Sequence, residues 1–487
     1  MKTLRIGHLP DLHGLPGLAE AELAWQALPG TALPEGHRLE VPVLDIQALQ
    51  ALCAHLRGPG RLALRALPVR AIVEAIDATI QELLDPASEA HQNLLYWLPL
   101  STGFSAEMVR LNLNATLRTY RAPQLQRFLA EDLGGADMLD GFAPRVNGGL
   151  CRAEGAALLT HVWAGNVPGL PLWSLVSGLL VKAGNLGKVS AGEPVLASVF
   201  ARTLARHSPV LGQALAVLWW DRSDTARAHA VWAASEVVLA FGGDAALAEL
   251  QQQMPAGVRF LAHGHKISFG AVGREALSAT RAPRIARLAA QDVVRHEQQG
   301  CYSPQVFYVE RGGQVPPEEF AERLAAELAQ LATRFPRPEP GLAEATQIAQ
   351  WRSRQEWAGE GVQLMGHPTQ AWSVAFHAQP LPLEPGPLHR CVQVVAVDTL
   401  EDLPPWLDGR RRHLQTVGLA VSPQRLQPLA GLLAGCGVTR LCALGHMPLP
   451  APGWHNDGRP SLLDLVNLVD LEASAETLAE TLSTYEP

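Results

Sequence analysis

The chain has 487 residues, more than one hydrophobic core usually organises, so we expect two or three domains. Apolar residues make up 47% and charged residues 18%, a composition that excludes a disordered chain. The formal net charge of -8 provides no overall attraction to nucleic acid or to an anionic membrane surface.

The six cysteines are spread along the chain and none forms a C-x-x-C pair. We therefore expect neither a disulfide framework nor a metal site, and a reducing cytoplasm is the favoured compartment. Residues 1–14 contain no apolar segment typical of a secretory signal. The most apolar long stretch, 166–186, is interrupted by Pro168, Pro171 and Lys182, which argues against a membrane span.

In chain order, residues 1–150 predict a mostly helical leading region; in 70–84, for example, Ile72, Ile76 and Ile80 recur at helical spacing. From about residue 160, short apolar runs alternate with helical stretches. This alternation predicts a parallel, doubly wound sheet of Rossmann type, with its ligand at the carboxyl ends of the strands. The expected strands are 161–167, 183–190, 214–220 and 236–241, and the helices after the first two of them begin at residues 170 and 193.

A second group of elements follows residue 300. It comprises an amphipathic helix over 316–335 and strands at 306–310, 391–398, 416–422 and 439–445. We therefore predict three units. Residues 1–289 form the helical leader and the dinucleotide-binding domain, and 290–445 form a catalytic α/β domain. Residues 446–487 return to the first domain or to a subunit interface.

Cys301 follows a glycine in a polar turn that leads into the strand at 306–310. Such a loop exposes a thiol, and backbone N–H groups together with His296 provide a way to stabilise its thiolate, as a nucleophile requires. The alternative from the residues alone is a small buried hydrophobic side chain, which is the commonest state of a free cysteine.

The segment DVVRHEQQGCYSPQ (292–305) resembles the cysteine segment of the LuxC-type fatty acyl-CoA reductases, which belong to the aldehyde dehydrogenase superfamily. Further matches follow in the family order and span about residues 100 to 460: LPLSTGFSAEM (98–108), WAGNVPG (163–169), KAGNLGKVSAGEP (182–194), VVLAFGG (237–243), HGHKISF (263–269), HRCVQVVAVD (389–398) and DGRP (457–460). The resemblance implies an aldehyde-dehydrogenase-like α/β fold, with a Rossmann-type parallel-sheet cofactor domain and a second α/β domain that carries the cysteine.

The resemblance implies that Cys301 attacks an acyl thioester and becomes acylated. Asn166 matches the superfamily asparagine that hydrogen-bonds the thioester oxygen, and together with the Cys301 backbone N–H it would form an oxyanion hole. The alternative for Asn166 is turn chemistry, because Gly165 and Pro168 beside it also suit a turn.

Lys188 matches the superfamily lysine that contacts the adenosine ribose. Three positions later, where many relatives carry a glutamate that repels a 2′-phosphate, this chain has Ala191, so the resemblance favours NADPH over NADH, with Ser190 available to bond the phosphate. Gly242 and Gly243 resemble the glycine turn near the pyrophosphate, where the backbone must approach closely.

Hydrolytic aldehyde dehydrogenases carry a glutamate base four residues before the lysine that matches Lys266, and here that position is Ala262. Alanine cannot activate water, so an acyl-cysteine is expected to accept hydride rather than to be hydrolysed. His263, His265 and His455 are candidates for substrate contact or acid–base chemistry, and packing, surface or loop-capping roles are the alternatives. The aspartate of HNDGRP (455–460) is a further candidate to approach the site.

The resemblance therefore predicts NADPH-dependent reduction of a fatty acyl thioester, presented as acyl-CoA or by an enzyme, to the aldehyde. The alternatives are a cysteine-dependent acyltransferase or thioesterase, and a noncatalytic acyl-binding partner of an acyl-activating complex. The family also implies an acyl-protein synthetase or transferase as partner, and the superfamily implies a homo-oligomer joined through an exchanged β-flap.

Overall fold

The computed structural model describes residues 1–11, 23–31, 33–146, 148–451 and 453–482. The N-terminal region begins with a small sheet in the order β1-β3-β2, formed by Lys2–Arg5, His37–Val43 and Ala24–Ala27. Helices follow, as the sequence predicts: α1 (Ile46–His55), α2 (Arg61–Arg65), α3 (Val69–Leu84), α4 (Glu89–Thr102), α5 (Ala106–Arg118), α6 (Ala122–Leu133) and α7 (Asp137–Asp140). The helices of the leading region therefore begin only at residue 46, and the three strands before them were not predicted.

The cofactor sheet has five parallel strands in the order β10-β9-β6-β7-β8. They are Arg259–His263, Val237–Phe241, Leu158–Val162, Gly184–Lys188 and Leu215–Leu218, each within a few residues of its predicted position where one was predicted. The crossovers run through α8 (Leu170–Leu180), α9 (Val195–His207), α10 (Pro209–Gln213), α11 (Thr225–Ala234) and α12 (Asp244–Gln252). The strand order reverses between β6 and β9, which is where a doubly wound sheet offers its ligand crevice.

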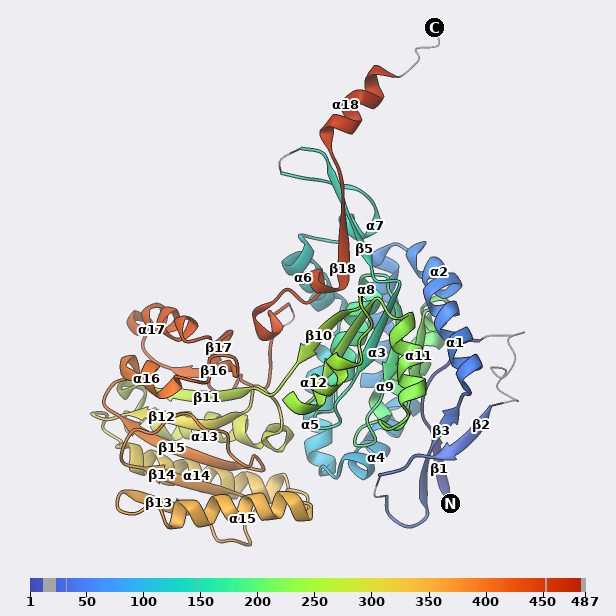
Figure 1. Cartoon of the computed structure of the whole chain (residues 1–487). Coiled ribbons are helices and arrows are strands. Elements are labelled where there is room, and N and C mark those ends of the chain that lie inside the picture. The colour runs from blue at the N-terminus through green and yellow to red at the C-terminus, as the bar shows by residue number, and fades with distance from the viewer. Residues whose placement is uncertain (12–22, 32, 147, 452, 483–487) are drawn as a thin grey trace.

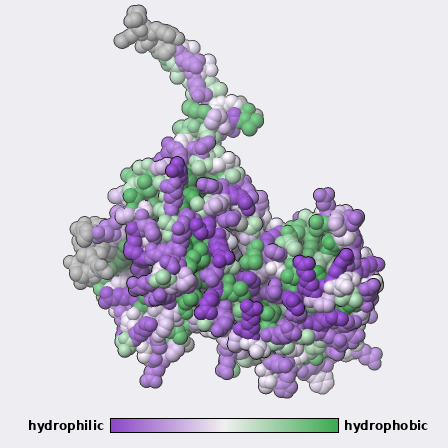
Figure 2. All heavy atoms as spheres, turned by 180° about the vertical axis from the view of Figure 1, so that it is seen from behind, coloured by the Kyte–Doolittle hydropathy of each residue, from purple (hydrophilic) through white to green (hydrophobic). Residues whose placement is uncertain are grey.

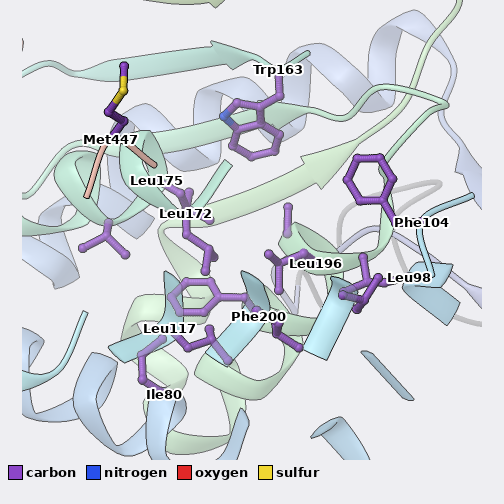
Figure 3. Close-up of a cluster of buried hydrophobic side chains, with 14 of the residues drawn as sticks. Ile80, Leu98, Phe104, Leu117, Trp163, Leu172, Leu175, Leu196, Phe200 and Met447 are labelled. Carbon is purple, nitrogen blue, oxygen red and sulfur yellow. The ribbon is translucent and has the colours of Figure 1, made fainter. Parts of the chain in front are cut away.

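One face of this sheet is covered by α8 and α9, and the leader helices α3, α4 and α5 pack over them. Figure 3 shows the resulting core, in which Phe200 and Leu196 of α9 lie among side chains from α3, α5 and α8. Phe200 and Leu196 are fully buried. The leader thus completes the hydrophobic core of the cofactor domain, and through α5 it also supplies one wall of the site described below.

The second sheet has seven strands in the order β13-β14-β15-β12-β11-β16-β17, with only β13 antiparallel to its neighbour. The strands are Val362–Met365, Ser373–His377, Cys391–Val397, Pro304–Glu310, Ile267–Val272, Leu414–Ala420 and Arg440–Ala443. The helices of this domain are α13 (Ala282–Val294), α14 (Pro317–Arg334), α15 (Leu342–Glu356), α16 (Pro404–Leu407) and α17 (Pro423–Gly435).

The predicted division after residue 289 differs from this arrangement. The central strand β11 already belongs to the second sheet, so the chain crosses between sheets in residues 264–266. The three residues at the crossing, Gly264, His265 and Lys266, are also typical of an ordinary turn between two strands of one sheet, so they do not mark a change of domain.

After β17 the chain returns to the N-terminal half. Strand β18 (Val466–Leu471) pairs antiparallel with β5 (Leu150–Gly155), which also pairs with β4 (Ala143–Pro144). With helix α18 (Ala473–Thr481) these strands form an arm that projects from the body (Figure 1), and hydrophobic atoms show on its surface (Figure 2). Within the described residues, no helix combines the length and hydrophobicity that crossing a membrane requires.

Candidate active site

A cavity of about 420 Å³ lies where the carboxyl ends of the cofactor strands face the amino ends of the second sheet. Its wall includes residues 164–170 after β6, 241–243 after β9, 263–266 between the sheets and 299–302 before β12. Cys301, Asn166, Gly242, Gly243, His263 and His265 all line it. Lys188, Ser190, Ala191 and His455 are outside this lining.

Cys301 is exposed, unlike the buried Cys53 and Cys391, so it is not the small buried hydrophobic side chain of the alternative interpretation. Its carbonyl accepts a hydrogen bond from the Ser268 hydroxyl at 2.7 Å, which ties the turn to β11. The protein atoms around the sulfur and, to a smaller extent, the Asp457 carboxylate together raise the pKa of the thiol to about 11. The free protein therefore holds mostly thiol at neutral pH, so acylation needs a group that takes its proton.

His296, which the sequence suggested as a group that stabilises the thiolate, has no positive charge to do so. Complete burial, together with the smaller effect of nearby Arg295, lowers its pKa to about 3, so the imidazole is neutral at pH 7. The structure instead places a polar network beside the sulfur. Gln415, at the amino end of β16, lies close enough to the Cys301 sulfur to lower the pKa of the thiol, in opposition to the larger effect of burial, and its Nε2 donates to Asp457 at 3.0 Å. The Gln415 Oε1 atom is buried without a hydrogen-bond partner among the described residues.

Asp457 accepts a hydrogen bond from His263 Nδ1 at 2.9 Å and lies 3.6 Å from the Lys266 ammonium. Burial alone would raise the pKa of Asp457, but the hydrogen bond from His263 and the charge of Lys266 hold it below its ordinary value. An ionised carboxylate only accepts, so Nδ1 carries the proton of the hydrogen bond to Asp457, and in this tautomer Nε2 is an acceptor. The ring stacks on Phe241, with 4.9 Å between ring centroids.

Asn166 lies on the turn after β6, and its amide donates to the Gln299 carbonyl at 3.0 Å, two residues before Cys301. The turn needs its glycines. A Cβ on Gly165 would lie 2.6 Å from the Ser190 hydroxyl, and Gly169 has a φ of 104°. Asn166 is therefore held against the cysteine loop, on the same wall of the cavity.

The expected cofactor residues lie at the carboxyl edge of the first sheet. Lys188 ends β7 with its ammonium 5.3 Å from the Trp220 ring centroid, and burial lowers its pKa. Ser190 accepts from the Gly192 N–H at 3.2 Å, and the Ala191 carbonyl accepts from the Thr31 hydroxyl at 3.0 Å. Gly243 is the residue before α12, and a Cβ there would meet nothing within 4 Å.

The other two histidines have different surroundings. His265 is exposed on the cavity wall, and partial burial of its ring, opposed by Asp244, lowers its pKa. His455 lies close enough to Asp132 to lower that carboxyl's pKa, in opposition to the larger effect of burial. His455 therefore faces the α6 side, and the next two residues, Asn456 and Asp457, are the members of HNDGRP that line the cavity.

The cavity continues on its apolar side between α5 and the residues after β17. Thr119, Tyr120, Trp173, Pro450 and Trp454 line both the main cavity and an adjoining one of about 60 Å³ that ends at Leu125 and Phe128. These residues and Gln415 were not predicted from the sequence, because they come from segments hundreds of residues apart. For Gln415 the available signal was a polar residue at the amino end of a buried strand.

Two turns beside the cavity have left-handed backbone at ordinary residues. His296, Glu297 and Gln298 have φ values of 52°, 52° and 65°, and residues 388–390 have φ values of 64°, 54° and 64°. Each such residue costs about 1–3 kcal/mol and persists only where its surroundings over-determine it. Among the residues that the structure describes, no cluster of three or more His, Cys, Asp or Glu is placed to hold a metal.

Solved structures share this architecture. A methylmalonate-semialdehyde dehydrogenase from Oceanimonas doudoroffii superposes with a TM-score of 0.70, at 12% identity and with 97% and 98% of the two chains covered. An indole-3-acetaldehyde dehydrogenase complexed with NAD⁺ gives a TM-score of 0.72, at 15% identity and with 97% of each chain covered. The fold is therefore that of the aldehyde dehydrogenases, as the sequence predicts.

Residues 64–468 match the acyl-CoA reductase (LuxC) family, and this chain belongs to that family. It is 26% identical over 382 residues to the long-chain acyl-protein thioester reductase of Photorhabdus luminescens, covering 78% of this chain and 77% of the relative. The corresponding reductase of Vibrio harveyi is 25% identical, with 76% of each chain covered. The chain is thus an oxidoreductase of the class that reduces acyl thioesters to aldehydes, which confirms the predicted family and enzyme class.

Proposed function

We propose that the protein reduces a fatty acyl thioester to the aldehyde with NADPH, through an acyl intermediate on Cys301. The observation that carries this proposal is the position of Cys301 between the cofactor crevice and the apolar extension of the cavity. Asp457 is the one carboxylate among the described residues that line the cavity, and its pairing with His263 and Lys266 leaves it a poor base for water.

In the proposed acylation, His263 Nε2 takes the Cys301 proton, and the sulfur attacks the thioester carbon. Asn166 Nδ2 and the Cys301 backbone N–H donate to the oxyanion, which requires the carboxamide to leave the Gln299 carbonyl. As the carbon–sulfur bond of the donor breaks, the His263 imidazolium returns the proton to the departing thiolate. The acyl chain extends toward Tyr120, Trp173 and Trp454, whose aromatic surfaces suit an alkyl chain.

The residues present fit a dinucleotide. A pyrophosphate would suit the crevice between β6 and β9, where the space over Gly243 is open and no side chain caps the start of α12. Lys188 lies at the end of β7, on the other side of β6. NADPH, when bound, supplies the hydride that reduces the acyl-cysteine. Collapse of the resulting thiohemiacetal at Cys301 releases the aldehyde and restores the thiolate. Asn166 and the backbone N–H hold the oxygen's negative charge until then.

We expect Ala191→Glu to reverse the cofactor preference. The new carboxylate would repel a 2′-phosphate and accept hydrogen bonds from a ribose diol, so kcat/KM with NADPH should fall about 10- to 100-fold relative to that with NADH. Initial rates with each dinucleotide at saturating acyl-CoA measure this ratio. Ala191→Gln, which has nearly the same size without the charge, is the matched control. An unchanged ratio in Ala191→Glu would place the 2′-phosphate elsewhere.

The function is tested by incubating the protein with dodecanoyl-CoA in the absence of NADPH. Intact-mass measurement should show one added acyl group, and peptide mapping should place it on Cys301. Addition of NADPH should then remove the adduct, with one aldehyde formed per NADPH oxidised. Release as the free acid, with NADPH unconsumed, would identify a thioesterase. Comparison of acyl-CoA with an acyl protein as donor shows which of the two this chain accepts, and whether it uses an acyl-protein synthetase or transferase as partner.

We also propose that the chain forms a homo-oligomer through its arm. Apolar side chains stand exposed there, including Leu468 and Val469 on β18 and Leu478 on α18, and β4 and β18 are the edge strands of their sheet. A second copy that pairs with such an edge would bury both features.

The double variant Leu468→Glu/Val469→Glu should therefore shift the protein to monomer in light scattering, because it places two charges on the surface to be buried. Leu342→Glu, at the start of α15 and more exposed than either residue of the arm, should leave the oligomeric state unchanged. A wild-type protein that is already monomeric at micromolar concentration would refute the proposal.

A further inference from the structure

The two left-handed turns described above, 296–298 before Cys301 and 388–390 before β15, are joined by a buried ion pair between Glu297 and Arg390. We propose that this pair is a positioning device that aims the Cys301 sulfur at the acyl carbon. The proposal rests on the function proposed above. It assigns a role to two residues that do not line the cavity and that act through the nucleophile.

The ion pair has the geometry of a two-point clamp. Arg390 Nε donates to one Glu297 oxygen at 2.6 Å and Nη2 donates to the other at 2.7 Å. Nη2 also donates to the Phe335 carbonyl at 2.7 Å, which anchors the guanidinium at the end of α14. Both side chains of the pair have no exposed surface. Parallel hydrogen bonds between a planar fork and a carboxylate fix direction as well as distance.

Neighbouring contacts fasten both turns to the strands that follow them. Gln298 Nε2 donates to the Pro304 carbonyl at 2.7 Å and to the Cys391 carbonyl at 3.1 Å, at the first residues of β12 and β15. These two strands are adjacent in the sheet. The second turn also supplies Leu388 to the cavity wall. The ion pair therefore fixes the position of the Cys301 loop relative to the 388–390 turn, and both contribute to the cavity wall.

The strain explains why a clamp is needed. Six ordinary residues hold a backbone conformation that they rarely adopt, and the ion pair is the strongest tie between the two runs. Cys301 follows Glu297 by four residues, so relaxation of the first turn displaces the sulfur. Because neither Glu297 nor Arg390 is among the cavity-lining residues, their loss should lower kcat while KM for the acyl donor stays unchanged.

The test compares Glu297→Gln with Glu310→Gln in the full-length protein. Glu310 is a matched control because it is also a fully buried carboxylate, bound by Arg274 and Arg425, at the opposite end of β12. We expect Glu297→Gln to slow acylation by dodecanoyl-CoA about 100-fold, as a small misplacement of a nucleophile does. Alkylation of the same thiol by iodoacetamide, which has no fixed approach, should change little. Glu310→Gln should lose thermal stability yet acylate at the wild-type rate.

Wild-type acylation in folded Glu297→Gln would overturn the proposal, and so would an equal loss in both variants or a parallel loss of acylation and alkylation. If Glu297→Gln does not fold, Arg390→Lys keeps the charge and removes the fork, and it should show the same division between acylation and alkylation. Failure of the proposed function is recognised separately, because the wild-type protein would then form no acyl adduct on Cys301, or Cys301→Ala would still form one.

Discussion

Cys301→Ala should abolish the acyl adduct and lower the rate of NADPH-dependent aldehyde formation by about 10⁴- to 10⁶-fold, the range found when a covalent nucleophile is removed. The expectation follows from the geometry, since Cys301 is the one cysteine among the described residues that line the cavity. The oxyanion donors and His263 remain in the variant, but without the sulfur there is no acyl-enzyme to reduce. Stopped-flow recording of NADPH absorbance with dodecanoyl-CoA measures the loss.

Cys436→Ala is the control, because Cys436 follows α17 outside the cavity lining and should be dispensable. Thermal stabilisation by NADPH should be the same in Cys301→Ala and wild type, since the expected cofactor contacts come from the first sheet. Residual turnover in Cys301→Ala within tenfold of wild type would show that hydride transfer proceeds without an acyl-cysteine, and would remove the basis of the proposed function.

The parts of the site that could be predicted are those formed by residues close together in the sequence. The Cys301 segment, the Asn166 turn and the Gly242–Gly243 turn each form from a continuous stretch with its own turn chemistry, and the structure places all three on one cavity. Apolar runs likewise predicted β8 and β9 of the cofactor sheet, because parallel strands that are buried on both faces are continuously apolar.

The rest depends on contacts between distant segments. The His263–Asp457 pair joins positions 194 residues apart and the Glu297–Arg390 pair positions 93 apart, and neither separation has a local signature. His296 is the opposite case, in which a residue close to Cys301 in the sequence does not have the predicted role. Proximity in sequence suggested that it stabilises the thiolate, whereas burial leaves it neutral. The crossing between the two sheets lies before the predicted division after residue 289, and the short segment 264–266 that makes it is typical of any turn between strands.

Asp457→Asn should raise the alkylation rate of Cys301 and lower the turnover rate of the enzyme. The carboxylate raises the pKa of the thiol, so its removal should lower that pKa from about 11 and increase the thiolate fraction at pH 7. Iodoacetamide should then alkylate the free protein faster, by about tenfold if the pKa falls by roughly one unit. Turnover should fall, by about 10²- to 10⁴-fold, because an asparagine no longer holds the His263 tautomer that accepts at Nε2.

The pH dependence separates the two effects. In wild type the alkylation rate should rise about tenfold per pH unit up to the thiol pKa near 11, and in Asp457→Asn the whole curve should move to lower pH. Lys266, His265 and Gln415 also face this network and are unchanged in the variant. Asp464→Asn removes a carboxylate from the same segment that pairs with Arg459, and it should leave both rates at wild-type values. If alkylation and turnover of Asp457→Asn instead rose together, the thiolate population alone would limit the reaction, and His263 would have no part in moving the proton.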